Sequence, residues 1–294
     1  MSLRHFDPSF VWRTFILSYE HFYGIIRAVT TVNREVRDMG KDSDEFVRSI
    51  ARGLSVIEAL GKPPGRHTLA EAADLADLNR ATARRILATL VALNYCSADG
   101  RYFSLRPRAL GLGLSYLNAL PYWGYAQRAL EDLRNEIGES CALAVLDEQE
   151  IVYALRLPAR RILSTNLGIG SRLPAHLVSL GRVLLAALPA EAHAAYLASV
   201  ELKPVTPRTV TDAARLGAIL VDVEKQGYAW IDGELDPSIC GIAVPLRDQA
   251  GSVVAAISVN TISGTVTEAG AKKKYLIPLK RTAQDIRSQM LSSR

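Results

Sequence analysis

The stretch NRATARRILATL, residues 79–90, decides how the first half of this 294-residue chain folds. Its apolar residues recur at helical spacing, and the stripe they predict consists of Ala83, Ile86, Leu87, Leu90 and Leu93. At about 100° per residue, Ala81, Arg85, Ala88 and Ala92 point directly away from the stripe, with Arg84 on one flank and Thr82 and Thr89 on the other. An ordinary solvated face would mix Glu with Lys, but residues 78–98 contain no acidic residue. The pattern therefore favours a helix that enters the DNA major groove, where small residues allow close approach and guanidinium groups reach bases and phosphates.

Two further helices are predicted before this one. Residues 47–61 have apolar side chains at helical spacing and end on a glycine. Residues 68–78 begin with Thr68 followed by Glu71 three positions later, which is the spacing of a capping box. Asn79 is then the expected N-cap of the third helix, which runs to about residue 93.

A hairpin follows the three helices. Residues 95–105 form two strand-like runs around Asp99-Gly100, the strongest short hairpin signal. Three helices and a hairpin over residues 47–106 predict a winged helix-turn-helix, with Arg101 on the wing, where it would touch the backbone or the minor groove. The DNA contacts that we expect are Asn79, Arg80, Ala81, Thr82, Arg84, Arg85, Thr89 and Arg101.

The net charge of the chain, +5, is concentrated in this segment. Residues 47–110 contain ten Lys or Arg and five Asp or Glu, whereas residues 111–294 contain 19 basic and 18 acidic residues. From charge alone, a phosphate-binding surface and a solvated basic face are equally good interpretations. The helix pattern favours the first, with double-stranded DNA as the partner.

The remaining composition excludes several classes. No apolar run approaches the roughly 18 residues that a membrane span requires, and the first 25 residues lack the uninterrupted apolar core of a signal peptide. The three cysteines are an odd number and lie far apart, which fits a reducing cytosol. None of the five histidines has a second His or Cys at metal-ligand spacing. We therefore expect a cytoplasmic protein with no metal, no cofactor and no membrane association.

The second half predicts a different kind of domain. Residues 107–120 predict a linker helix, and residues 121–294 predict an α+β domain for effector binding and oligomerisation, because strands and helices are segregated there. The strand-like runs are 141–147, 150–157, 161–165, 228–232, 240–248 and 252–262, and the helical runs are 121–138, 176–188, 191–200, 214–227 and 267–291.

These segments resemble the IclR-type bacterial transcriptional regulators. The resemblance rests on VRSIARGLSVIEAL, TLAEAADLADLNRATARRILATLVALNY and DGRYFSLRPRALGLGLSYL in the first half, and on RLPAHLVSLGRVLLAALP, LKPVTPRTVTD, QGYAWIDGEL and IAVPLRDQAGSVVAAISVN in the second. It covers roughly residues 45–292, and it is greatest for the subgroup that controls protocatechuate and 4-hydroxybenzoate catabolism. It implies a winged helix-turn-helix joined by a linker helix to a GAF-like α+β effector domain, and a regulator of aromatic-compound catabolism that senses a small organic acid.

The resemblance also implies effector contacts, to which we add Leu173 as an apolar wall. The expected set is Leu173, Ser179, Leu180, Asp232, Ile239, Gly241, Ser258 and Asn260. We expect the carboxylate of an aromatic or β-keto acid at the helix start over residues 176–181, where free backbone N–H groups attract anions, and at Ser258 or Asn260. Asp232 should face the hydroxyl or keto end of the ligand, or solvent. Relatives usually have Gly-Leu-Arg-Ser before IAVP, and this chain departs from that pattern over residues 234–245.

Other functions stay open at this point. The regulator could serve another carboxylate pathway, the second domain could only dimerise, or the chain could be an enzyme with an incidental basic helix. LVSLG (177–181) lacks the leading glycine of a nucleophile elbow, no G-K-[ST] follows Gly168–Gly170, and His176 has no accompanying nucleophile at a fixed spacing. We expect a homodimer or a dimer of dimers, because a two-fold protein matches a pseudo-palindromic operator.

Residues 1–46 form an N-terminal extension that the resemblance does not cover. Seven of the 20 aromatic residues of the chain fall within its first 23 positions. The extension is either an extra amphipathic helix that packs on a partner subunit, or a product of an upstream start codon with Met39 as the true beginning.

Overall fold

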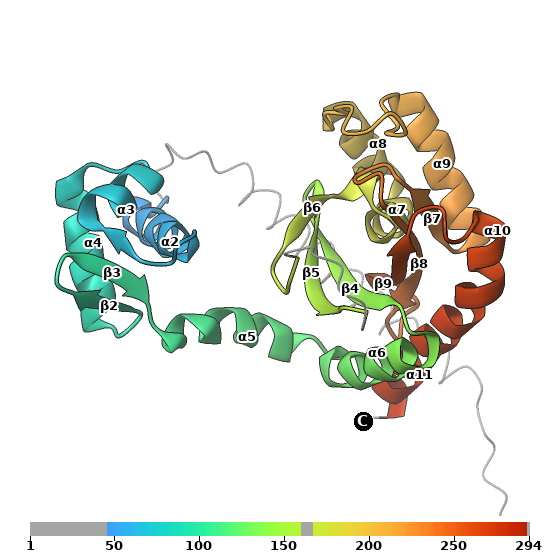
Figure 1. Cartoon of the computed structure of the whole chain (residues 1–294), viewed down its shortest axis with the longest axis horizontal. Helices are drawn as coiled ribbons and strands as arrows, with labels where there is room; N and C mark the ends of the chain where they lie inside the picture. The colour runs from blue at the N-terminus through green and yellow to red at the C-terminus, as the bar shows by residue number, and fades with distance from the viewer. Residues whose placement is uncertain (1–45, 160–166, 293–294) are drawn as a thin grey trace, which may run out of the picture. The chain divides into compact units, whose positions relative to one another are not determined.

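The computed structural model describes residues 46–159 and 167–292, which divide into two compact units between Leu112 and Gly113 (Figure 1). The N-terminal extension and the strand predicted at 161–165 lie outside the described residues. None of the helices in the described part of the chain combines the length and the hydropathy that a membrane crossing needs.

The smaller unit is a winged helix-turn-helix. Its described elements are α2 (Arg48–Gly61), β1 (His67–Thr68), α3 (Leu69–Leu75), α4 (Arg80–Ala92), β2 (Cys96–Asp99) and β3 (Tyr102–Leu105). The strands pair antiparallel in the order β1-β3-β2. The sequence did not predict β1, which is only two residues long. The helices enclose a small core made of Val56, Leu60, Ala72, Leu87, Leu90 and Cys96.

Side-chain caps fix where α3 and α4 begin. Thr68 and Glu71 form the predicted capping box, in which the Glu71 carboxylate accepts from Thr68 N at 2.7 Å and Thr68 Oγ1 accepts from Glu71 N at 3.3 Å. Asn79 Oδ1 accepts from Thr82 N at 2.8 Å at the start of α4. Each cap satisfies a backbone N–H group that has no partner inside its helix.

A helical segment leads into the larger unit. The 3-10 turn η1 (Pro107–Ala109) continues into α5 (Leu110–Ala119), and α6 (Trp123–Ile137) ends at Gly138, whose φ of 74° is the left-handed C-cap conformation. Nearly all of α5 is exposed; Leu117 is its buried residue.

The larger unit is built on a six-stranded antiparallel sheet in the order β6-β5-β4-β9-β8-β7. Helices α6 and α11 cover one face, and α7 lies on the other with α9 packed against it (Figure 1). The strands are β4 (Ser140–Asp147), β5 (Glu150–Leu157), β6 (Arg172–Pro174), β7 (Ala229–Asp232), β8 (Ile239–Arg247) and β9 (Val253–Ile262), and the helices after α6 are α7 (Ser179–Ala186), α8 (Ala190–Ser199), α9 (Ala213–Gln226), α10 (Glu268–Ala271) and α11 (Ile277–Ser292).

Two predicted helices are not regular α-helices along their whole length. The helix expected over 176–188 is a 3-10 turn, η2 (Ala175–Leu177), followed by α7, with Val178 in an extended conformation between them. A Cβ on Gly181 would lie 2.0 Å from the Ala175 carbonyl oxygen, so this glycine lets the turn fold back onto α7. The C-terminal helix expected over 267–291 contains a π-helical turn, η3 (Lys272–Leu276), between α10 and α11.

Candidate DNA and effector sites

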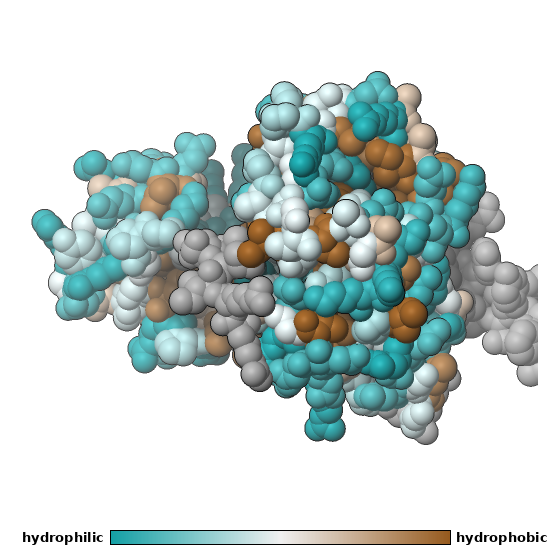
Figure 2. Space-filling view, turned by 45° about the vertical axis from the view of Figure 1, so that its right-hand side comes forward, coloured by the Kyte–Doolittle hydropathy of each residue, from teal (hydrophilic) through white to brown (hydrophobic). Residues whose placement is uncertain are grey.

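The face of α4 that points away from the core has the predicted composition. Ala83, Leu87 and Leu90 are buried, whereas the exposed residues are Arg80, Ala81, Arg84, Arg85, Ala88, Thr89 and Ala92. Thr82 is half-buried, and the Thr89 hydroxyl donates to Arg85 O at 2.9 Å. Leu93 was wrongly placed in the apolar stripe: it is the C-cap of α4 and is 51% exposed. Hydrophilic side chains cover most of the face of this unit that is visible in Figure 2.

The wing presents a second basic group that the sequence only partly predicted. Arg101 donates to the Tyr102 hydroxyl at 3.0 Å, and its guanidinium lies 5.1 Å from the centre of the Tyr102 ring. Arg66 lies 4.7 Å from the same ring and pairs with Asp99 at 2.8 Å. Arg66 was missed because it precedes β1 in the sequence, and only the β1-β3 pairing brings it to the wing.

Two exposed arginines of the basic segment make local contacts near the C-terminus of α4. Arg108 donates to Leu93 O at 3.0 Å and stacks on Tyr95, and Arg106 donates to Asn94 Oδ1 at 3.4 Å. Cations at a helix C-terminus are stabilised by the helix dipole and by the unpaired carbonyl groups. These two arginines therefore have a structural role. The count of basic residues in the segment could not distinguish that role from DNA binding.

The larger unit contains a partly open cavity of about 80 Å³ between α7 and one end of the sheet. Six of the eight predicted effector residues line it, namely Leu173, Ser179, Leu180, Ile239, Gly241 and Asn260. The other lining residues are Ser140, Tyr153, Arg156, Leu167, Leu177, Val178, Ile231, Leu235, Asp236, Cys240 and Thr261.

Ser179, Gly241 and Asn260 meet at one point of this cavity. A Cβ on Gly241 would lie 2.3 Å from Asn260 Oδ1 and 3.3 Å from Ser179 Oγ. Gly241 pairs with Asn260 across β8 and β9, and Ser179 begins α7. The absence of a side chain at Gly241 thus makes room for a hydroxyl and an amide, both polar groups suited to a ligand.

Ser258 and Asp232, the other two predicted effector residues, are not among the residues that line this cavity. Ser258 is fully buried, and its Oγ accepts from Asn260 Nδ2 at 2.9 Å, which turns Asn260 Oδ1 toward Gly241. The Asp232 carboxylate pairs with Arg208 at 2.7 Å and accepts from Ser263 Oγ at 2.6 Å. Ser258 therefore orients the cavity residue Asn260, and the Asp232 carboxylate is held at the end of β7 by Arg208 and Ser263.

The cavity contains groups that the sequence analysis did not single out. Arg156 and Asp236 are the charged residues of its described lining. Asp236 Oδ1 accepts from Ser238 N at 2.8 Å and from Ser238 Oγ at 2.7 Å, and these hydrogen bonds lower the pKa of its carboxyl. Burial raises the pKa of Cys240 to about 11, so this residue is a neutral thiol at neutral pH.

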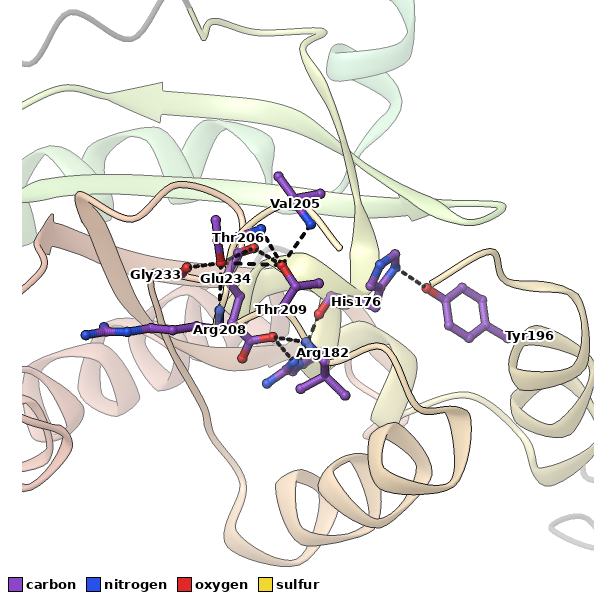
Figure 3. A network of polar contacts seen from close by, with 10 residues as sticks. His176, Arg182, Tyr196, Val205, Thr206, Arg208, Thr209, Gly233 and Glu234 are labelled. Carbon is purple, nitrogen blue, oxygen red and sulfur yellow. Dashed lines mark hydrogen bonds and ion pairs between the residues drawn. The ribbon is translucent and has the colours of Figure 1, made fainter. Parts of the chain in front are cut away.

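A buried polar network links α7 to the segment that follows β7 (Figure 3). Arg182 and Glu234 form an ion pair at 2.6 Å, and Arg182 Nε also donates to His176 O at 3.0 Å. Thr206 Oγ1 donates to Gly233 O at 2.6 Å, and Thr209 Oγ1 donates to Glu234 O at 2.8 Å. The network ties α7 to residues 233–234, which directly precede the cavity residues Leu235 and Asp236.

His176 belongs to this network, and its imidazole is uncharged at neutral pH. Its Nδ1 lies 3.3 Å from the Tyr196 hydroxyl, and burial, with the nearby Arg182 charge, lowers its pKa to about 4. Within the described parts of the chain, no group of three or more His, Cys, Asp or Glu side chains is arranged to hold a metal ion.

Comparisons with known proteins agree with this architecture. A model of the IclR helix-turn-helix domain matches residues 49–100, and a model of the bacterial transcriptional regulator IclR C-terminal domain matches residues 114–288. The chain is 36% identical over 247 residues to the Pca regulon regulatory protein of Pseudomonas putida, covering 84% of this chain and 85% of that protein. It is 31% identical over 251 residues to the p-hydroxybenzoate hydroxylase transcriptional activator of Acinetobacter baylyi, covering 84% and 93%. An IclR homolog from Microbacterium hydrocarbonoxydans, crystallised with 4-hydroxybenzoate, superposes with a TM-score of 0.75 at 27% identity, covering 83% of this chain and all of that one.

Proposed function

Because the chain belongs to the IclR family of bacterial transcriptional regulators, we propose that it binds its operator through α4 and the wing and releases or engages it in response to a small organic acid in the α7 cavity. The observation that carries the proposal is that one chain has both an exposed helix face with arginines and no acidic residues, and a largely apolar cavity. The first fits DNA, and the second fits a small ligand.

The DNA half of the proposal assigns different tasks to different arginines. Arg84 and Arg85 lie in the first turns of α4 among exposed alanines, so their guanidinium groups have access to base edges in the major groove. Arg101 and Arg66 flank Tyr102 on the wing, where they contact phosphates or the minor groove. Base specificity then comes from α4, and salt-dependent affinity comes from both surfaces.

The effector half assigns an aromatic or β-keto acid from ring catabolism to the cavity. Most of the lining is apolar, and a few polar groups converge at Ser179 and Asn260, as small-molecule sites require. The relatives named for the Pca regulon and for p-hydroxybenzoate hydroxylase, and the structure that holds 4-hydroxybenzoate, support this ligand class.

The exposed apolar residues of α5 support the proposal of a homodimer or a dimer of dimers. Leu110, Leu112, Leu114 and Tyr116 are between 43% and 65% exposed, and a single copy leaves them in water. Pairing α5 with a second copy buries these side chains and creates a two-fold protein that matches a pseudo-palindromic operator.

Thermal shift assays with 4-hydroxybenzoate, protocatechuate and β-ketoadipate test the effector class. At least one acid should raise the melting temperature of the wild-type protein, because a ligand that binds only the folded state stabilises it. Replacing Ser179 and Asn260 together by alanine should abolish the shift, whereas Asn135→Ala on the exposed surface of α6 should leave it unchanged. If no acid stabilises the wild-type protein, its effector belongs to another class or the domain serves only for assembly.

A further inference from the structure

The alternation of side chains along β5 is interrupted. Ile151 and Tyr153 face the α7 side of the sheet, and a regular strand would continue on that side with residues 155 and 157. Instead, Ala154 and Leu155 both lie in the core on the α6 and α11 side. The register with β4 shows the reason: Leu143 pairs with Leu155 and Ala144 with Tyr153, so one residue on β5 is extra.

This β-bulge reverses the side to which the rest of β5 points. Arg156 pairs with Ala142, a residue of the α7-side core, and lines the cavity beside Tyr153. Without the extra residue, Arg156 would point into the apolar core beneath α6 and α11. Bulges that re-aim a side chain recur next to binding and active sites, so the irregularity delivers a guanidinium to the ligand cavity.

From this placement we infer that Arg156 is the counter-ion of the effector's carboxylate. The inference rests on the proposed function and refines it, because the sequence alone placed the carboxylate at the start of α7. Arg156 is half-buried, and its Nη1 donates to Leu167 O at 3.1 Å, which holds the side chain against the cavity wall. A guanidinium is a planar group with five N–H donors that suits a carboxylate better than a lone helix start does.

The position of the other charged lining residue fixes the direction of the ligand. Asp236 lies between β7 and β8, whereas Arg156 is on β5, and β4 and β9 separate β5 from β8. At about 4.8 Å per strand, roughly 14 Å of sheet lies between the two strands. A carboxylate would be repelled by ionised Asp236 and attracted by Arg156, so it binds at the β5 side. A hydroxyl donor at the other end of the ligand then faces the Ser179 and Asn260 side of the cavity, which selects hydroxylated acids.

Paired ligands that differ only in charge test the inference. Isothermal titration of the full-length protein compares 4-hydroxybenzoate and protocatechuate with 4-hydroxybenzamide and 3,4-dihydroxybenzamide. Arg156→Gln should weaken binding of the acids by at least about tenfold, since a charge-assisted bidentate pair is lost, and should change binding of the amides much less. Arg156→Lys should retain part of the preference for acids. The matched control is Arg172→Gln, which removes an exposed arginine of β6 that pairs with Asp147 and Glu150. It should change the binding of neither the acids nor the amides.

The outcomes separate the inference from the function on which it rests. If the wild-type protein binds an acid and Arg156→Gln binds it equally well, Arg156 is not the counter-ion. If Arg156→Gln weakens acids and amides alike while its unliganded melting temperature is unchanged, the side chain only shapes the cavity, and the inference is also wrong. If the wild-type protein binds none of these acids but still binds operator DNA, the proposed effector class has failed.

Discussion

The buried ion pair between Arg182 and Glu234 allows a quantitative prediction about stability. The two side chains are 3% and 10% exposed, and the distance between them is 2.6 Å. Glu234→Gln keeps the volume but leaves the Arg182 cation buried without a counter-ion. Breaking a buried pair on one side costs about 3–5 kcal/mol of unfolding free energy. For a unit of this size, that corresponds to a decrease in melting temperature of roughly 6–20 °C.

Two control variants show that burial, and not pairing alone, sets this magnitude. Arg208→Gln breaks the pair with Asp232, in which the arginine side chain is 58% exposed, and should cost no more than about 1 kcal/mol. Replacing both buried partners, as in Arg182→Met with Glu234→Leu, removes the unpaired charge and should restore most of the lost stability. Urea unfolding followed by circular dichroism measures all of these changes. Similar small losses for Glu234→Gln and Arg208→Gln, or a double variant less stable than Glu234→Gln alone, would refute the reasoning.

Three further predictions concern DNA binding, pH and backbone packing. Arg85→Ala should reduce the free energy of operator binding by about 1–3 kcal/mol and relax the sequence preference. Arg101→Ala should weaken binding to all DNA sequences similarly and lower the slope of log K against log salt concentration by about one. Fluorescence anisotropy at several salt concentrations distinguishes the two effects. The pKa of His176 is lowered to about 4 in the folded state, so the unfolded state binds a proton first as the pH falls. The unfolding free energy should therefore decrease by roughly 3 kcal/mol between a pH of about 6.5 and a pH of about 4. In urea titrations, His176→Phe should make the unfolding free energy less dependent on pH over this range. Gly181→Ala should strongly destabilise the larger unit because its Cβ would lie 2.0 Å from a carbonyl oxygen, whereas Gly124→Ala in α6, with nothing within 4 Å, should stabilise it by up to about 1 kcal/mol in thermal unfolding.

The elements that local patterns specify could be predicted from the sequence. The capping box at Thr68 and Glu71, the cap at Asn79 and the Asp99-Gly100 turn each depend on residues close together in the chain, and all lie where expected. The exposed face of α4 follows from helical periodicity in the same way.

The features that were missed depend on long-range pairing. Arg66 reaches the wing only through the β1-β3 pairing, and Arg156 faces the cavity only because one extra residue on β5 is not matched on β4. The break between η2 and α7 likewise depends on the close approach of Gly181 to Ala175. A bulge leaves no mark in the periodicity of a largely apolar strand, so periodicity could not place Arg156 on the correct face of the sheet.

The coupling between the cavity and DNA binding is the central claim, and a single titration tests it most directly. Labelled DNA from the protein's own promoter is titrated with the full-length protein by fluorescence anisotropy, with and without saturating 4-hydroxybenzoate or protocatechuate, beside a scrambled sequence of equal length. Salt-sensitive binding should favour the promoter over the scrambled sequence, and an acid should change the promoter Kd by several-fold in one direction, because typical coupling free energies are about 1–3 kcal/mol. Equal affinity for both sequences, or a promoter Kd that neither acid changes although the acid is shown to bind, would contradict the account.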